Sequence, residues 1–255
     1  RSTLFPYTTL FRSGIRVIFG VEGLKVHAKL THIGSSRGDI ACVSTGNFHE
    51  GNARTYTDVA LLTADRRLTR EVERVFEFIR QPARPFAFDH LVVSPRDMRR
   101  KLNALIADEA RRARQGEEAY ILAKVNHITD AKLIRRLYAA AAVGVRLRLL
   151  VRGNCSIVAS AHDRGRIEIR GIIDRYLEHS RILIFGHGGD ERIYIGSADW
   201  MTRNLDNRVE AYAPVYDEAV RRELRRIVDE GLADNVAARV VDGTGDNLLY
   251  DDGRP

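Results

Sequence analysis

Large apolar residues alternate with polar or small residues in the first third of the chain, as they do in half-buried β-strands. This alternation predicts strands at residues 15–19, 25–33, 40–44 and 59–63. Apolar residues then recur at helical spacing over residues 68–79, and Asp65 or Thr69 can cap the N-terminus of that helix. Pro82 follows the helix and prevents it from continuing.

Strands and helices alternate through the rest of the chain as well. Short apolar segments predict strands at residues 91–94, 119–125, 146–151, 166–172, 181–185 and 192–195. Amphipathic segments predict helices at residues 97–114, 130–142 and 219–232. Strands that alternate with helices of this length indicate an α/β fold, with mixed sheets flanked by helices. The proline-containing segment 82–90 is the best candidate for a linker between two domains.

Composition narrows the class of protein without naming a function. The chain has 255 residues, of which 44% are hydrophobic, which is enough for one large or two small packed domains. Cys42 and Cys155 form neither a disulfide framework nor a CxxC metal motif, so a reducing cytoplasm is expected. No apolar run approaches the roughly 20 residues of a membrane-spanning helix, which argues against an integral membrane protein. The net charge of +7 favours anionic partners in general.

The first thirteen residues, RSTLFPYTTLFRS, differ from everything that follows. They show neither helical nor alternating periodicity, and they lack the charged and apolar regions of a signal peptide. They resemble the translation of sequencing-adapter DNA. We therefore interpret residues 1–13 as a non-native or disordered leader, and we expect the chain to be a fragment whose natural N-terminal part is missing.

An internal repeat gives the clearest indication of chemistry. A histidine followed two residues later by a cation occurs twice, and the two copies lie 152 residues apart. In both copies a polar residue follows the histidine by 20 positions and an acid follows it by 31. The matched pairs are His27 and His179, Lys29 and Arg181, Asn47 and Asp199, and Asp58 and Glu210. Matching residue types at equal offsets predict two homologous half-sites related by pseudo-two-fold symmetry.

The repeated residue types suit phosphate chemistry. On a strand, a histidine and a cation two residues apart point to the same face of the sheet. The imidazole can act as nucleophile or acid, and the cation can neutralise phosphoryl oxygens. Small residues around Asn47 and Asp199 let backbone amides approach an anion. A single histidine of this kind is usually just packed in the fold, but two copies at matched spacing favour a phosphoryl-transfer site.

This arrangement resembles the phospholipase D superfamily, in which two His-x-Lys motifs from two halves form one site. Longer segments resemble the C-terminal catalytic half of bacterial polyphosphate kinase, the long-chain-synthesising family. Among them are LKVHAKL, LVRGNCS, RYLEHSRILIFGHGGDERIYIGSADWMTRNLDNRVE and LADNVAAR. The resemblance implies two phospholipase D-like domains with the active site at their interface. They are a truncated first domain at residues 14–81 and a second at 91–240, followed by a tail at 241–255.

The resemblance also implies an activity, which is ATP-dependent, reversible extension of inorganic polyphosphate through a phosphohistidine. It makes His27 the phosphorylated nucleophile, with Lys29 beside it. His179, beside Arg181, is then a second histidine that assists proton transfer or stabilises the transferring group. Contacts to ATP and phosphate are implied for Tyr56, Arg152, His179, Asn47 and Arg54. Because half of the first domain is expected to be absent, we expect this fragment alone to be inactive.

Partners and a cofactor follow from the same resemblance. ATP, ADP and polyphosphate are the implied ligands, rather than nucleic acid, and Mg²⁺ is expected to bind together with ATP. No carboxylate cluster in the sequence predicts a cage for this ion, so no metal ligands are assigned. A cytoplasmic location, peripheral association with the inner face of the membrane, and a homo-oligomeric full-length enzyme are further expectations.

Two positions separate this chain from classical phospholipase D motifs. Those motifs carry an aspartate seven residues after each histidine, where this chain has Gly34 and Gly186. The difference argues against the alternative function, a phosphodiesterase or nuclease of the wider superfamily. A third hypothesis is a non-catalytic module that binds polyanions. Such a module would show steep salt dependence and would take up no phosphate at His27.

Overall fold

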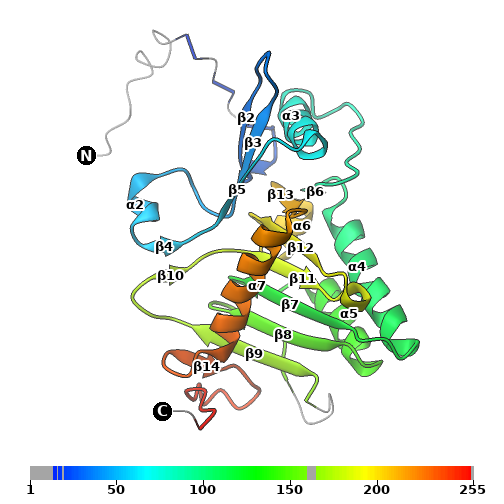
Figure 1. Cartoon of the computed structure of the whole chain (residues 1–255), viewed down its shortest axis with the longest axis vertical. Coiled ribbons are helices and arrows are strands. Elements are labelled where there is room, and N and C mark those ends of the chain that lie inside the picture. Colours follow the sequence, from blue (N-terminus) through cyan, green and yellow to red (C-terminus); the bar gives the residue numbers. More distant parts are fainter. Residues whose placement is uncertain (1–13, 16, 19, 160–164, 254–255) are drawn as a thin grey trace.

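A mixed β-sheet runs through the centre of the molecule in the computed structural model, which describes residues 14–15, 17–18, 20–159 and 165–253 (Figure 1). Its strands are β1 Lys25–Val26, β6 Val92–Ser94, β7 Tyr120–Val125, β8 Arg146–Val151, β9 Ile167–Ile172, β11 Ile182–Phe185, β12 Arg192–Gly196, β13 Arg208–Pro214 and β14 Ala238–Val240. They lie in the order β1-β13-β12-β11-β7-β8-β9-β14, and β6 also pairs with β13. Strands β7, β8 and β9 are parallel, whereas β11 is antiparallel to both of its neighbours.

Two smaller sheets come mainly from the first half of the chain. Strands β2 Lys29–Ile33, β3 Ile40–Ser44 and β5 Ala60–Thr63 form an antiparallel sheet, whose β2–β3 hairpin projects at the top of Figure 1. Strand β4 Tyr56–Thr57 pairs in parallel with β10 Leu177–Glu178, which is far away in the sequence. The β4–β10 pair therefore joins the two halves of the chain directly.

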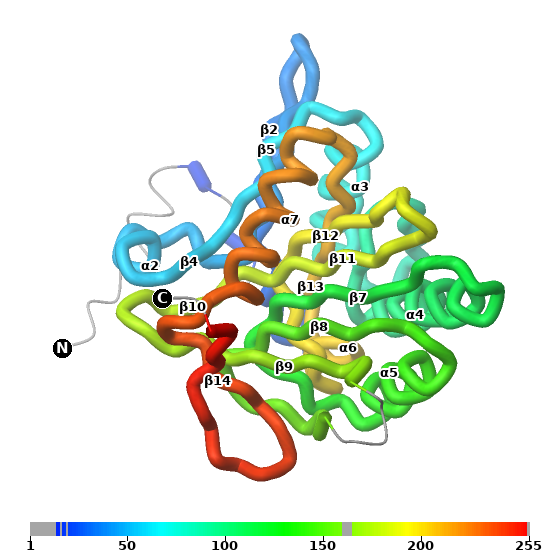
Figure 2. The backbone as a smooth tube through the Cα atoms, turned by 60° about the horizontal axis from the view of Figure 1, so that its bottom comes forward, coloured from blue at the N-terminus to red at the C-terminus, as the bar shows by residue number. Residues whose placement is uncertain are grey.

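Helices cover both faces of the large sheet. They are α2 Glu50–Ala53, α3 Arg66–Arg80, α4 Met98–Arg114, α5 Ala131–Ala142, α6 Thr202–Asp206 and α7 Glu218–Ala233, with a 3₁₀ turn η2 at His187–Gly189. Helices α4 and α5 pack together on one face, and Figure 2 shows α7 crossing the other. Among the described residues, no helix combines the length and the apolar character that a membrane span requires.

Successive residues of β7 supply the two cores on either side of the sheet. Ile121 packs in a cluster with Leu102 of α4 and Leu133 of α5. Leu122, the next residue, packs in a different cluster with Leu224 and Val228 of α7. The pleat of a strand requires this alternation, and burial of each such side chain contributes roughly 2 kcal/mol. The large sheet is consequently a rigid platform, buried on both faces.

Helix α3 fixes the small β2–β3–β5 sheet against the large one. Its residues Leu68, Val72 and Val75 share a core cluster with Val43 of β3 and with Val209 of β13. The cluster joins an element of the first half to a strand of the second half. The β2–β3–β5 sheet is therefore packed against the large sheet rather than attached by a linker alone.

The predicted α/β class, with mixed sheets flanked by helices, is confirmed. Helices α4, α5 and α7 each begin and end within one residue of the predicted bounds. Helix α3 begins directly after Asp65, whose side chain accepts a hydrogen bond of 2.8 Å from the Arg67 amide. Asp65 is therefore the N-terminal cap, and Thr69 lies inside the helix.

The prediction of one continuous strand at residues 25–33 is wrong. Strand β1 ends at Val26 and β2 begins at Lys29, so His27 and Ala28 lie between strands. The predicted strand at 15–19 is not found in its described residues 15, 17 and 18, and residues 16 and 19 lie outside the described residues. The predicted leader, residues 1–13, also lies outside them. Elements that the sequence did not predict are α2, α6, β4, β10, β13 and β14.

Candidate active site

The break between β1 and β2 results from how the backbone meets β13. Strand β1 pairs in parallel with β13, with Lys25 opposite Arg208 and Val26 opposite Val209. The amides of His27 and Ala28 then both donate to the carbonyl oxygen of Val209, each over 2.9 Å. Two successive donors on one acceptor interrupt the ladder, as in a β-bulge. The interruption places the His27 side chain at the junction of the two halves.

The same backbone arrangement occurs around the second histidine. Strand β10 pairs in parallel with β4, with Leu177 opposite Tyr56 and Glu178 opposite Thr57. The amides of His179 and Ser180 both donate to the carbonyl oxygen of Thr57, over 3.4 and 2.9 Å. Each residue of this pairing lies 152 positions from its counterpart in the β1–β13 pairing. The pseudo-two-fold repeat predicted from the sequence therefore also relates the hydrogen bonds of the structure.

Each histidine is bound to the acid of the opposite half. Nδ1 of His27 lies 2.9 Å from Oε2 of Glu210, and Nδ1 of His179 lies 2.9 Å from Oδ1 of Asp58. A carboxylate accepts from Nδ1, so this contact fixes the imidazole tautomer and leaves the lone pair on Nε2. The crossed pairing means that neither half can form its histidine–acid pair alone.

A hydroxyl group supports each acid, and the sequence analysis did not assign either of them. Thr45 Oγ1 donates to Asp58 Oδ1 over 2.6 Å, and Ser197 Oγ donates to Glu210 Oε2 over 2.5 Å. Both hydroxyls stand 18 residues after their histidine, so the repeat contained the signal that could have identified them. They restrict the rotation of the acids and thereby of the imidazoles.

The two cations differ in how they are neutralised. Lys29 is 7% exposed and its Nζ donates to the His27 carbonyl oxygen over 2.7 Å. Arg181 makes the corresponding bond to the His179 carbonyl oxygen over 2.8 Å, and it also forms a two-point ion pair with Asp199 at 3.2 Å. Burial lowers the pKa of Lys29 to about 8, although the charge of Glu210 opposes the shift. The first half-site therefore holds the cation that can still lose its proton near neutral pH.

Electrostatics keep the His179–Asp58 pair as a neutral imidazole and a carboxylate. Burial lowers the pKa of His179, although the hydrogen bond that its Nδ1 donates to Asp58 opposes the shift. Burial alone would raise the pKa of Asp58, but the hydrogen bonds from His179 and Thr45 outweigh it and hold that pKa below its ordinary value. Arg181 also approaches Nε2 of His179 at 3.0 Å, as a donor would approach the free lone pair.

Two further predicted residues lie around His179. The rings of Tyr56 and His179 have centroids 4.9 Å apart and are tilted by 59°. Arg152 donates through Nε to Asn126 Oδ1 over 2.8 Å, and burial lowers the pKa of its guanidinium. Both side chains are only partly buried, so they present surface to a ligand next to the histidine.

Two other predicted residues are not brought to the histidines by contacts among the described residues. Asn47 is exposed in the loop after β3, where its carbonyl oxygen accepts from the His49 amide. Arg54, at the C-terminal end of α2, is exposed and its guanidinium bonds the Glu50 carboxylate. Their roles in binding ATP or phosphate remain predictions that rest on the resemblance.

The acids beside the histidines do not form a magnesium cage in the described part of the chain. Asp58 and Glu210 hold the histidines, and Asp199 holds Arg181 and accepts from the Asn126 amide over 2.8 Å. An Mg²⁺ cage needs oxygen ligands in near-octahedral geometry, usually with several waters. These three paired carboxylates do not fit that requirement.

Comparison with known proteins identifies the family to which the chain belongs. The family model described as polyphosphate kinase C-terminal domain 2 matches residues 91–254, and the one described as C-terminal domain 1 matches residues 6–85. The chain belongs to the polyphosphate kinase family. The second match begins inside the segment that we interpret as a leader, so the origin of residues 1–13 stays a prediction.

Individual relatives cover most of this chain but little of their own length. The polyphosphate kinase of Salmonella typhimurium is 46% identical over 238 residues, which is 91% of this chain and 35% of that protein. That of Vibrio cholerae is 44% identical over 94% of this chain and 35% of its own length. The crystal structure of polyphosphate kinase from Porphyromonas gingivalis is 38% identical with a TM-score of 0.89, over 97% of this chain and 40% of that one. The chain therefore spans about a third of the length of these curated relatives.

Proposed function

We propose that this chain carries the phosphoryl-transfer site of an ATP–polyphosphate phosphotransferase, with His27 as the nucleophile. The observation that supports this most directly is the crossed pairing of two histidines with two acids, beside two buried cations. Family membership favours it over the phosphodiesterase alternative. The reaction would reversibly move the γ-phosphoryl group of ATP to the end of a polyphosphate chain.

The two histidines differ in a way that favours His27 for attack. Its side chain is 24% exposed, against 13% for His179. Glu210 holds Nδ1 of His27, and no protein group bonds its Nε2 among the described residues. Nε2 of His179, in contrast, lies against Arg181. The lone pair of the His27 Nε2 is therefore the accessible one.

His27 and its neighbours can account for each bond, the proton and the leaving group of the proposed transfer. The His27 Nε2 lone pair forms a bond to the γ-phosphorus while the bond from that phosphorus to the β,γ-bridging oxygen breaks, and ADP leaves. The Nδ1 proton stays on the imidazole, held by the carboxylate of Glu210. In the second step the terminal oxygen of polyphosphate attacks the phosphohistidine and releases the neutral imidazole. Lys29, Arg181 and Arg152 would stabilise the charge on the phosphoryl oxygens.

The nucleotide would lie on the side of His179. Tyr56 offers a partly exposed ring for stacking or hydrogen bonding to the base, and Arg152 offers a guanidinium for phosphate. Magnesium would arrive bound to the ATP phosphates, because the paired acids described above leave it no cage. ATP and polyphosphate as the ligands follow from family membership and form part of this proposal.

Labelling with γ-³²P-ATP tests the proposal in a protein of the relatives' full length that carries this chain. We expect acid-labile label on the unaltered protein and none on His27→Ala, because the nucleophile is gone. His179→Ala is the matched control from the other half-site, and should still take up label but turn over roughly 10²-fold more slowly. Label that persists on His27→Ala would contradict the assignment of the nucleophile.

A further inference from the structure

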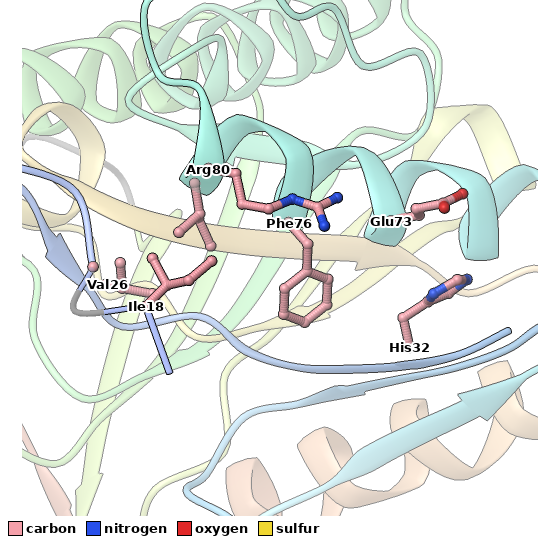
Figure 3. A pocket seen from close by; sticks show the side chains of 8 residues that line it. Ile18, Val26, His32, Glu73, Phe76 and Arg80 are labelled. Atoms are coloured by element: carbon pink, nitrogen blue, oxygen red, sulfur yellow. The ribbon is translucent and has the colours of Figure 1, made fainter. Parts of the chain in front are cut away.

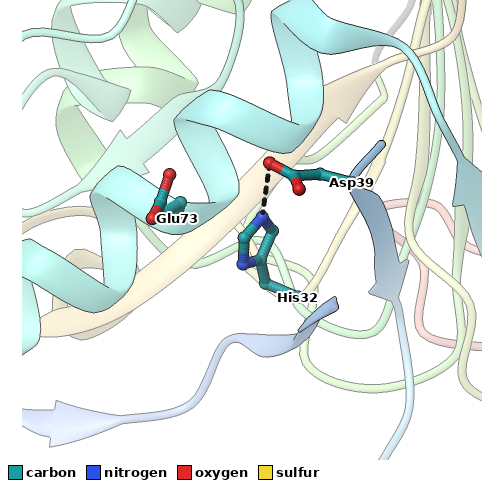
Figure 4. A group of neighbouring side chains, drawn as sticks. All are labelled: His32, Asp39 and Glu73. Atoms are coloured by element: carbon teal, nitrogen blue, oxygen red, sulfur yellow. Dashed lines mark ion pairs between the residues drawn. The ribbon is translucent and has the colours of Figure 1, made fainter. Parts of the chain in front are cut away.

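Three potential metal ligands meet away from the paired histidines. His32 lies on β2, Asp39 directly precedes β3, and Glu73 lies on α3. Figure 4 shows their side chains converging between the β2–β3 hairpin and the helix. One ligand atom from each residue lies within 4.8 Å of the other two, and among the described residues this is the only such group of three. Nothing in the proposed phosphoryl transfer uses these residues.

The separation of the first two ligands suits a metal ion better than a hydrogen bond. Nε2 of His32 lies 3.5 Å from Oδ2 of Asp39 (dashed line in Figure 4). Two ligands of a tetrahedral Zn²⁺ at about 2.1 Å from the ion lie about 3.4 Å apart. A direct N–H···O bond would be about 2.9 Å long. The pair is thus spaced as two corners of a coordination polyhedron.

The histidine nitrogen also lacks a hydrogen bond among the described residues. Nε2 of His32 is buried and makes no hydrogen bond within the described part of the chain. An unpaired buried polar atom costs roughly 1–3 kcal/mol, so such atoms usually have an explanation. The other oxygen of Asp39, Oδ1, accepts from the Ser35 amide over 3.3 Å. That bond orients Oδ2 toward the imidazole, as outer hydrogen bonds orient the ligands of metal sites.

A cavity gives the group access from solvent. It has a volume of about 530 Å³, and His32 and Glu73 line it together with apolar side chains such as Val26 and Phe76 (Figure 3). Arg80 lines it too. An ion could enter by this route and keep one or two waters beside its three protein ligands. An entry path and an open coordination position are both expected of a genuine site.

We infer that His32, Asp39 and Glu73 form a binding site for a divalent transition metal of the Zn²⁺ type. One imidazole and two carboxylates suit Zn²⁺, Co²⁺ or Mn²⁺, whereas Mg²⁺ prefers all-oxygen ligands. Two carboxylates also balance the charge of a divalent ion. Because the ligands come from the hairpin and from α3, the bound ion would fasten the hairpin to the helix. It would raise the thermal stability of the chain.

Titration of the metal-free chain with ZnCl₂ in a calorimeter tests the site. The unaltered chain should bind one Zn²⁺ at this site. In each of His32→Gln, Asp39→Asn and Glu73→Gln, we expect this binding to be absent or at least about tenfold weaker. His90→Gln, a half-buried histidine outside the group, should bind as the unaltered chain does. Co²⁺ in place of Zn²⁺ should give visible absorption bands of a four- or five-coordinate ion, and these bands should disappear in the same three variants.

The Glu73→Gln variant allows a clear test even if the other two variants fold poorly. Its side chain is exposed on α3, so Glu73→Gln should keep the melting temperature of the metal-free chain. Zn²⁺ should then raise the melting temperature of the unaltered chain but not of this variant. The inference is overturned if Zn²⁺ binding and the Co²⁺ bands survive all three substitutions. It is equally overturned if the unaltered chain binds no Zn²⁺ more tightly than about 1 mM.

Discussion

The half-sites around His27 and His179 share a backbone but differ in charge. In both, two successive amides donate to one carbonyl, an acid from the opposite half holds Nδ1, and a cation donates to the carbonyl of its own histidine. The difference lies 20 residues after each histidine. Asp199 neutralises Arg181, whereas its counterpart Asn47 is neutral and exposed.

This difference agrees with the proposal that the half-site of His27 carries the nucleophile and that of His179 does not. Arg181 is fixed by Asp199 and lies against Nε2 of His179, so that histidine is occupied on both nitrogens. Lys29 has no carboxylate within hydrogen-bond distance among the described residues, and its charge is available to an incoming anion. The two half-sites thus share their backbone geometry, whereas the change from Asn47 to Asp199, together with that from Lys29 to Arg181, alters their electrostatics.

The largest expected effect comes from substituting Glu210, the acid that holds the proposed nucleophile His27. Glu210→Gln keeps the size of the side chain but removes the charge that fixes the His27 tautomer. We expect kcat in the full-length enzyme to fall roughly 10³-fold, in the range seen for general acid–base groups and their partners. Steady-state synthesis of polyphosphate from ATP measures this.

Asp58→Asn provides the matched comparison. It alters the corresponding bond to His179, which is not the proposed nucleophile, so we expect a loss of only about tenfold in kcat. Labelling by γ-³²P-ATP should be slower in Glu210→Gln than in Asp58→Asn. Equal losses in the two variants would mean that the two half-sites contribute equally, against the asymmetry proposed here.

A smaller effect is expected on stability, from the ion pair that only the second half-site has. Asp199→Asn leaves the guanidinium of Arg181, which is 3% exposed, without its carboxylate. Breaking a buried pair typically costs 3–5 kcal/mol, and the remaining bonds to the carbonyls of Thr45 and His179 favour the lower end, about 3 kcal/mol.

Urea unfolding of the chain, followed by circular dichroism, measures this loss. The control is Asn47→Ala at the equivalent position, which is exposed and should change the free energy of unfolding by less than about 0.5 kcal/mol. A similar loss in both variants would show that the two positions have the same structural role. No loss in Asp199→Asn would show that the carbonyl bonds alone hold Arg181.

The sequence identified the histidines, cations and acids of the site, but neither the two hydroxyls that hold the acids nor the connections between these groups. Equal offsets identified both histidines, both cations and the acids Asp58 and Glu210. The crossed pairing could not be predicted, because it depends on β1 meeting β13 across 183 residues and on two-residue strands too short to show periodicity. Strand β13 itself was missed because nearly all of its residues are buried, so it shows no alternation.

Helices were predicted best, because an amphipathic stripe and a cap are local signals. Asp65 caps α3, which starts at the next residue, and α4 starts one residue after its predicted beginning. The break at His27 and Ala28 could not be predicted from local signals, since the apolar alternation continues through it and only the carbonyl of Val209 causes it. Arg54 entered through the resemblance alone and Asn47 through the repeat as well, and the contacts described here give neither a place beside the histidines.

The smallest expected effect is a pH dependence that only the first half-site should show. The Lys29 pKa of about 8 means that its ammonium is charged below pH 8 and loses its proton above. Anion affinity should therefore fall as pH rises from 7 to 9, by up to about tenfold, since roughly nine-tenths of the amine is neutral one unit above its pKa. The second half-site carries an arginine in place of the lysine, and no such slope is expected from it.

Binding of tripolyphosphate to the chain, measured by calorimetry at a fixed ionic strength, tests this slope. Lys29→Arg is the control, because it keeps a cation that does not titrate, and the anion's own titration cancels in the comparison of the two proteins. We expect affinity to decline more steeply with pH in the unaltered chain than in Lys29→Arg. Parallel slopes would mean that Lys29 keeps its proton to pH 9. The two half-sites would then not differ in protonation over this pH range.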